Sequence, residues 1–167
     1  AAGIYYTQRY ETATPVAAPQ DAASPPPQTG PAAGMVDDAR LANVEDGNWL
    51  AYGRDFRGHR FSPLTQINRD NVDELGLAWY RDMGTNRTSE ATPIVDNGVM
   101  YVTSAWSRVY ALEVDSGELL WSYDPQVSGE WNSKTCCDVI NRGVAVYRGK
   151  VYVGALDGRL HAIDAAT

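Results

Sequence analysis

Two adjacent cysteines are the residues of this sequence best suited to unusual chemistry. Cys136 and Cys137 are the only cysteines among the 167 residues. If they are bonded, they close a small ring whose Cα atoms lie within about 3.8 Å, below the usual disulfide range of about 4.4–6.8 Å. Such a ring is strained and rigid, and strain of this kind is typical of functional sites. The alternative is two free buried thiols, and the spacing alone leaves both interpretations open.

Two charged residues are further candidates for binding a ligand. Arg142 carries a planar guanidinium that stays charged and can bind a carboxylate through two parallel hydrogen bonds. Glu90 offers an anionic acceptor for hydrogen bonds. Without further context, both are equally typical of an exposed ion pair. His59 and His161 are isolated from each other and from other potential ligands, so we predict no metal site in these residues.

The elements that must position these residues are predicted to be short strands. Residues 93–95 and 99–103 flank Asp96-Asn97-Gly98, and an Asn-Gly pair supplies the positive φ angles of a tight hairpin. Two more strands, over 109–114 and 119–123, follow on either side of a turn. This pattern predicts an all-β meander of four strands.

An internal repeat indicates how such meanders are arranged. Gly98-Val-Met-Tyr-Val recurs as Gly149-Lys-Val-Tyr-Val after 51 residues, and Leu77-Ala78-Trp79 recurs as Leu119-Leu120-Trp121 after 42 residues. Self-similarity at about 40 to 50 residues is typical of a β-propeller. In each repeat a small alanine leaves room on an inner strand, a glycine takes a special φ, and a tryptophan covers the gap to the next blade. These structural positions are Trp79, Ala111, Gly117, Trp121 and Ala162.

The repeat also divides the chain. Residues 1–43 are rich in proline and alanine and are expected to form a disordered tail or linker. Residues 44–167 hold about two blades and part of a third, whereas propellers close with roughly four to eight. We therefore expect the N-terminal part of a larger propeller. The one helix predicted covers Asp70–Leu75, capped by Asp70 and ended by Gly76.

Charge and hydropathy exclude two classes of partner. The net charge is −7 and the pI is near 4.7, which leaves no basic surplus for nucleic acid. No stretch approaches the roughly 18 apolar residues that cross a bilayer.

From about Asn48 to Thr167, the sequence resembles the alcohol dehydrogenases that use pyrroloquinoline quinone (PQQ), of the quinoprotein and quinohaemoprotein type. The resemblance includes the segments 48–54, 61–68, 77–80 and 90–95. Its most specific part is Cys136-Cys137-Asp138-Val139-Ile140-Asn141-Arg142-Gly143.

This resemblance implies an eight-bladed propeller with PQQ at its centre, between a vicinal disulfide and a tryptophan. On the matching motifs, Cys136 and Cys137 would form that disulfide, and Glu90 and Arg142 would contact polar groups of the quinone. The calcium ion with its ligands, the catalytic aspartate and the tryptophan belong to later blades of the family, so no catalytic or metal-binding residue is named here.

The family also implies a reaction and its partners. A base removes the proton of the alcohol, and hydride passes to a quinone carbonyl polarised by calcium. Electrons then leave through a cytochrome c or a membrane subunit that reduces ubiquinone. A haem c would belong to another domain or subunit, because no Cys-x-x-Cys-His motif is present.

A second function is compatible with the repeats alone. Outer-membrane assembly lipoproteins share them and use a non-catalytic propeller as a docking platform in the cell envelope. A docking propeller has no use for adjacent cysteines with Arg142, which favours the enzyme. A vicinal disulfide and the resemblance both predict the periplasm.

Overall fold

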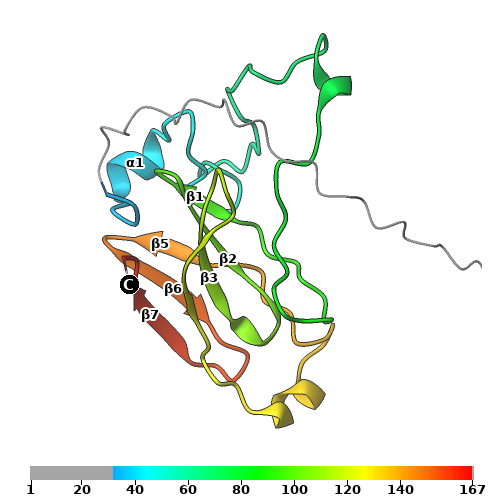
Figure 1. The fold of residues 1–167 in the computed structure, drawn as a ribbon. Helices are drawn as coiled ribbons and strands as arrows, with labels where there is room; N and C mark the ends of the chain where they lie inside the picture. Colours follow the sequence, from blue (N-terminus) through cyan, green and yellow to red (C-terminus); the bar gives the residue numbers. More distant parts are fainter. Residues whose placement is uncertain (1–31, 167) are drawn as a thin grey trace, which may run out of the picture.

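Two antiparallel sheets side by side form the body of the computed structural model, which describes residues 32–166 (Figure 1). The predicted tail lies largely outside the described residues. The first sheet consists of neighbouring strands β1 (Ile94–Asp96), β2 (Val99–Thr103), β3 (Val109–Glu113) and β4 (Leu119–Tyr123). The second consists of β5 (Ala145–Tyr147), β6 (Lys150–Gly154) and β7 (Leu160–Asp164). The predicted meander is confirmed.

The two sheets repeat each other residue by residue. Strands β5, β6 and β7 each begin and end 51 residues after β1, β2 and β3. The register repeats as well, since Ile94 pairs with Tyr101 and Ala145 pairs with Tyr152. The offset read from the sequence therefore corresponds to one blade, and the propeller fold class is confirmed.

The first hairpin of each sheet closes through a two-residue turn with positive φ. Asn97 and Gly98 have φ of 47° and 79°, and Arg148 and Gly149 have 45° and 76°. Asparagine tolerates the left-handed region better than arginine, so the second turn needs support. The N-terminal segment supplies it, because the backbone N–H groups of Arg148 and Gly149 donate to the carbonyls of Val36 and Gly34.

The folded part begins before the predicted boundary at Val44. Helix α1 (Asp38–Ala42) starts at Asp37, whose side chain accepts a hydrogen bond from the backbone N–H of Arg40. Val36 is fully buried in the core that both sheets share. The boundary predicted between residues 43 and 44 is therefore too late in the chain. The sequence does not reveal α1, because this helix is too short to produce a helical pattern of apolar residues.

A buried ion pair attaches this segment to the first sheet. Asp96 has no exposed surface, and it accepts hydrogen bonds from Arg40 Nη2 at 2.8 Å and from the backbone N–H of Gly34 at 2.6 Å. Glu45 binds the same guanidinium at 2.7 Å, which lowers its pKa to about 2. Since a buried charge without its partner is costly, α1 and the β1–β2 turn stabilise each other.

Two tryptophans make the same contact with successive sheets. Trp121 on β4 donates from Nε1 to the carbonyl of Ala165 at 3.0 Å, just beyond β7. Trp79 donates to the carbonyl of Val114 at 2.8 Å, just beyond β3. The two carbonyls are at equivalent positions, 51 residues apart. Trp79 therefore bonds to the first sheet in the same way as Trp121 bonds to the second.

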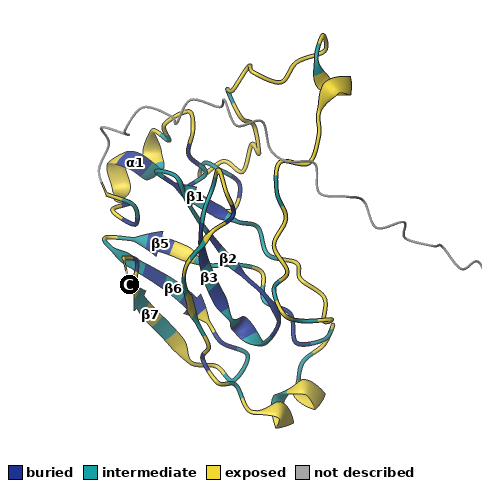
Figure 2. Cartoon of the chain, viewed as in Figure 1, coloured by how far each residue is buried: buried dark blue, intermediate teal, exposed yellow. Residues whose placement is uncertain are grey.

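The segment before the first sheet differs from the sequence prediction. Instead of a helix over Asp70–Leu75, the structure has one 3₁₀ turn, η1 (Val72–Glu74), with no side-chain cap and no left-handed Gly76. Asp70 instead donates its N–H to the side chain of Asn68. No strand forms over residues 77–80, where Leu77 and Tyr80 are exposed, because among residues 32–166 no neighbouring strand pairs with them. Figure 2 shows this projecting segment mostly in the colour of exposed residues.

We predict that Gly117→Ala destabilises the protein more than Gly158→Ala. Both glycines have positive φ, 71° and 86°, so each alanine carries a left-handed strain of about 1–2 kcal/mol. Only at Gly117 would the added Cβ overlap the Trp79 ring, whereas the space around Gly158 is open. In Gly117→Ala, overpacking should lower the free energy of unfolding by about a further 1–3 kcal/mol. Urea unfolding of both variants measures this difference. Equal losses would show that Trp79 does not pack against this turn.

Candidate functional site

Three of the four predicted cofactor-binding residues, Cys136, Cys137 and Arg142, lie on the connection between the two sheets, and Glu90 lies just before β1. After β4 the chain forms the 3₁₀ helix η3 (Gly129–Lys134) and then a loop over 135–143, before it enters β5. Cys137 and Asp138 both have φ of 67° in this loop. Such conformations cost about 1–3 kcal/mol each outside glycine and persist only where surrounding contacts enforce them.

Contacts from the first sheet hold this loop. The backbone N–H of Trp106, in the 3₁₀ turn η2 (Ala105–Ser107) between β2 and β3, donates to the carbonyl of Val139 at 2.9 Å. Val139 is fully buried. Arg87 forms an ion pair with Asp138 at 2.6 Å. The loop is thus fixed at Asp138 and at Val139, and these contacts support the left-handed conformation of Cys137 and Asp138.

Both cysteines project from this loop into solvent. Cys136 and Cys137 are separate thiols in the structure and both are exposed, so the alternative of two free buried thiols is wrong in the burial that it predicts. The predicted disulfide stays a prediction. The pKa of the Cys137 thiol is raised, first by hydrogen bonding to the neighbouring Cys136 side chain.

Arg142 and Glu90 lie beside the cysteines, although they are far apart in the sequence. Arg142 Nη2 donates to Glu90 Oε2 at 3.3 Å, and both side chains are exposed. Arg142 lowers the pKa of Cys137 and Glu90 raises it, as expected for charges close to the thiol. The structure brings together the four residues predicted to bind a cofactor.

Cys136, Cys137 and Arg142 border an open cavity of about 240 Å³. It combines two sulfur atoms, an apolar wall and one guanidinium. This donor set fits a flat ligand that bears carboxylates, because sulfur and aliphatic groups suit its face and arginine suits a carboxylate. The lining residues are Thr135, Cys136, Cys137, Asp138, Ile140, Arg142 and Leu156.

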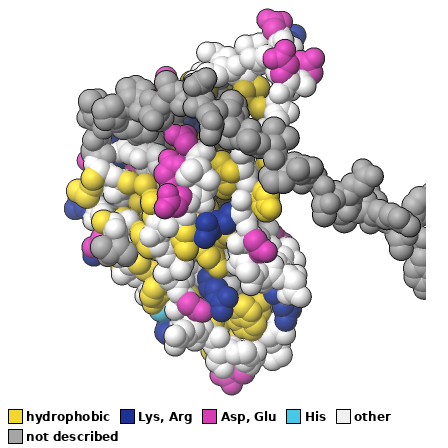
Figure 3. Space-filling view, viewed as in Figure 1, with side chains coloured by type: hydrophobic (Ala, Val, Ile, Leu, Met, Phe, Trp, Pro, Cys, Tyr) yellow, Lys and Arg dark blue, Asp and Glu magenta, His cyan; other side chains and the backbone are white. Residues whose placement is uncertain are grey.

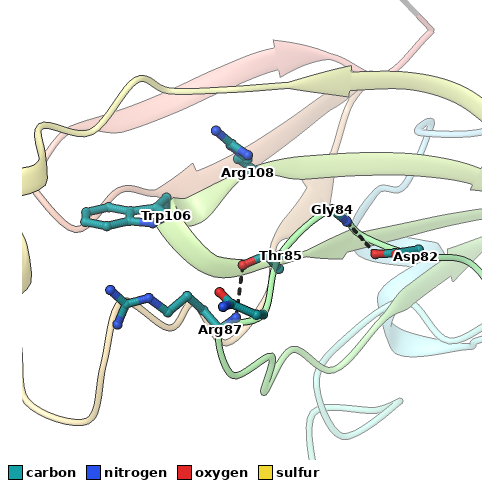
Figure 4. Close-up of a pocket in the computed structure, with 7 residues that line it drawn as sticks. Asp82, Gly84, Thr85, Arg87, Trp106 and Arg108 are labelled. Atoms are coloured by element: carbon teal, nitrogen blue, oxygen red, sulfur yellow. Dashed lines mark hydrogen bonds between the residues drawn. The ribbon is translucent and has the colours of Figure 1, made fainter.

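A larger hollow of about 560 Å³ lies next to this cavity. Figure 4 shows Arg87 and Trp106 on opposite sides of its open space, with Arg108 above. Arg87 lines this hollow while its partner Asp138 lines the smaller cavity, so the ion pair stands between the two. The larger hollow is the more polar of the two, and its arginines already have carboxylate partners.

Neither a cluster of metal ligands nor a membrane-spanning helix is present within residues 32–166. Residues 32–166 contain no group of three or more His, Cys, Asp or Glu side chains that could hold a metal ion. His161 instead forms a hydrogen bond with the Tyr123 hydroxyl at 2.9 Å. None of the helices in this range is long and apolar enough to span a membrane. On the face shown in Figure 3, acidic side chains lie among the basic ones.

Several site residues were missed by the sequence analysis. Leu156 belongs to the β6–β7 turn, where the pattern Asp157-Gly158 signals only a hairpin. Arg87 belongs to none of the motifs that indicate the site in the sequence. Nothing in the linear order of residues shows that these two segments meet the cysteine loop. Asp138, by contrast, is within the octapeptide that drew attention to the site.

Comparison with known protein families gives a direct match. The model of the family described as "PQQ: Glucose/ethanol/alcohol dehydrogenase, beta-propeller domain" matches residues 49–167. The chain is 60% identical over 121 residues, 72% of its length, to "1-butanol dehydrogenase (cytochrome c)" of Thauera butanivorans, of which it covers 18%. It is 55% identical over 126 residues, 75% of its length, to "Alcohol dehydrogenase (quinone), dehydrogenase subunit" of Gluconacetobacter polyoxogenes, of which it covers 17%.

A solved structure shows the same fold. The quinohemoprotein alcohol dehydrogenase ADHIIG of Pseudomonas putida HK5 superposes with a TM-score of 0.78 and 54% identity. The match covers 80% of this chain and 20% of that protein. The chain thus spans about a fifth of the length of the relatives it matches.

We predict opposite effects of the two charges on Cys137 in the reduced protein. Arg142→Gln removes a cation that stabilises the thiolate and should raise the pKa of Cys137, whereas Glu90→Gln should lower it. Lys134→Gln, the matched control, removes a cation that lies over the Trp131 ring and should leave the pKa unchanged. The pH dependence of Cys137 alkylation, followed by mass spectrometry, measures all three. Shifts of the same sign in both variants would contradict this arrangement of charges.

Proposed function

The chain belongs to the β-propeller family of PQQ-dependent glucose, ethanol and alcohol dehydrogenases, and from this membership we propose that it is the N-terminal part of an enzyme that oxidises alcohols to aldehydes or ketones. The observation that carries the proposal is that Cys136, Cys137 and Arg142 line one cavity, with Glu90 paired to Arg142. The activity belongs to a complete propeller, and the chain alone is expected to be inactive.

The residues at the cavity fit PQQ by their chemistry. The quinone is flat and carries three carboxylates, and it accepts two electrons from the alcohol when bound. Arg142 would bind a carboxylate, and Glu90 would hold the guanidinium in place through the ion pair seen at 3.3 Å. Cys136 and Cys137, joined as a disulfide, would offer a rigid wall to the ring and exclude water from it.

The remaining groups of the reaction are proposed to come from other parts of the propeller. A calcium ion would need oxygen ligands from several residues, and the described part of the chain has no such group. The same applies to the base that takes the alcohol proton. The role proposed for residues 32–166 is therefore to bind and orient the cofactor.

The electron acceptor and compartment are proposed from relatives. One relative is named for cytochrome c and another for quinone as acceptor, so we propose a cytochrome c or a quinone-reducing membrane subunit as the partner. A haem c, where present, would belong to another domain or to that partner. A vicinal disulfide is most stable in an oxidising compartment, which supports the periplasm as location.

The docking-platform alternative lacks comparable support. A docking propeller needs the blade repeats, but it has no need for two exposed adjacent cysteines beside an Arg142–Glu90 ion pair. Strained residues such as Cys137 would be a cost without a benefit in such a protein. We therefore keep this function as an outcome of the test below.

The test compares two ion-pair variants of the complete protein. Arg142→Gln should weaken PQQ binding about 10- to 100-fold, because a charge-assisted hydrogen bond contributes about 1.5–3 kcal/mol. Lys150→Gln removes an exposed cation from a similar pair with Asp164, at 3.1 Å and far from the cavity, and should change nothing. PQQ titration followed by fluorescence gives the affinity, and dye-linked oxidation of primary alcohols gives the activity.

The cysteines are tested in the same assay. Replacement of both by serine should abolish most of the dye-linked oxidation, because the rigid wall is lost. Normal oxidation by this double variant would remove the proposed role of the cysteines. If the wild-type protein neither binds PQQ nor oxidises alcohols, the proposed enzymatic function is overturned and the docking-platform function is favoured.

A further inference from the structure

Asn141 makes more hydrogen bonds than any of the site residues that flank it. Its amide nitrogen donates to Ser107 Oγ at 3.1 Å and to the carbonyl of Gly154 at 2.9 Å. Its amide oxygen accepts from Thr103 Oγ1 and from the backbone N–H of Gly143, both at 3.0 Å. The side-chain amide is therefore fully satisfied, in contrast to the exposed side chain of Arg142 next to it.

The partners of Asn141 belong to both sheets. Thr103 ends β2 and Gly154 ends β6, and these two positions are equivalent, one repeat apart. Thr103 and Ser107 are fully buried, so bonds to them are shielded from water and geometrically defined. One amide thus joins the same point of two successive blades at the end where the loops of the site converge, at the lower right of Figure 1.

The same amide fixes the backbone at Arg142. The bond from the N–H of Gly143 to Asn141 Oδ1 closes a tight turn around Arg142. The carbonyl of Arg142 accepts from the backbone N–H of Thr92 at 3.3 Å, and Gly143 has φ of 126°, with a Cβ at this position lying only 3.0 Å from the Thr92 carbonyl oxygen. Since Glu90 is the one hydrogen-bond partner of the Arg142 side chain within residues 32–166, the direction of this side chain depends on the anchored backbone.

We propose that Asn141 is the positioning residue of the cofactor site, which holds Arg142 and the adjacent cysteines in place across the junction of two blades. The proposal rests on the proposed function, since it assigns to Asn141 the orientation of groups that bind PQQ. Asn141 does not line the cavity, so it acts through Arg142 and the loop. Small displacements of such groups can reduce binding by about 10- to 100-fold.

The test replaces Asn141 in the complete protein and uses Asn48→Ala as matched control. Asn48 is a buried asparagine with a similar set of hydrogen bonds, since its amide nitrogen donates to two side chains and its oxygen accepts a backbone N–H, but it lies at the opposite end of the β1–β2 hairpin. Asn141→Ala should raise the dissociation constant for PQQ at least about tenfold, whereas Asn48→Ala should lower only the unfolding temperature.

A second measurement needs no cofactor. Because Arg142 lowers the pKa of Cys137, loss of its position in Asn141→Ala should raise that pKa in the reduced protein, as Arg142→Gln does. If Asn141→Ala does not fold, Asn141→Asp retains the acceptor oxygens, loses the donors to Ser107 and Gly154 and adds a negative charge. Because that charge alone raises the pKa of a nearby thiol, PQQ affinity is the measurement for this variant, and it should fall as in Asn141→Ala.

The outcomes separate this proposal from the proposed function. If the wild type binds no PQQ, the proposed function fails, and the pKa of Cys137 still decides the role of Asn141. If Asn141→Ala and Asn141→Asp bind PQQ as the wild type does, with an unchanged pKa of Cys137 in Asn141→Ala and only reduced stability, Asn141 is a structural residue and the proposal is overturned.

Discussion

A single type of contact sets the distance and angle between successive sheets, and the site depends on it. The indole of Trp121 on β4 reaches the carbonyl of Ala165 beyond β7 and also packs against Tyr101, with ring centres 6.0 Å apart. An indole gives a large apolar face and one directed donor, so it fixes both spacing and orientation. The loop over 135–143 spans this junction, and its geometry follows from the placement of the two sheets.

The N-terminal segment secures the same junction from the other end. Backbone bonds from Gly34 and Val36 reach the β5–β6 turn, and the buried pair of Arg40 with Asp96 reaches the β1–β2 turn. One short segment therefore contacts equivalent turns of both sheets. Removal of Asp96 would leave Arg40 buried with less compensation, so this contact adds specificity to the arrangement as well as stability.

Local patterns in the sequence were enough to predict the strands and the fold. Asn97-Gly98 favours a hairpin through its own φ preferences. The repeat offset of 51 residues then predicts the bounds of β5, β6 and β7 from those of β1, β2 and β3. The contacts of Leu156, Arg87 and Asn141 could not be predicted, because they depend on how segments far apart in the sequence pack. Helix α1 was missed for a different reason, since tertiary contacts stabilise it and local propensity does not.

A crystal structure of the complete protein grown with PQQ would test the central claim most directly, namely that the loop between the two sheets forms the wall of a quinone site. The account predicts the quinone ring against the sulfur atoms of Cys136 and Cys137, a carboxylate on the guanidinium of Arg142, and the Asn141 amide bound to both sheets as described. Quinone bound elsewhere, or an Arg142 side chain turned away from it, would contradict the account.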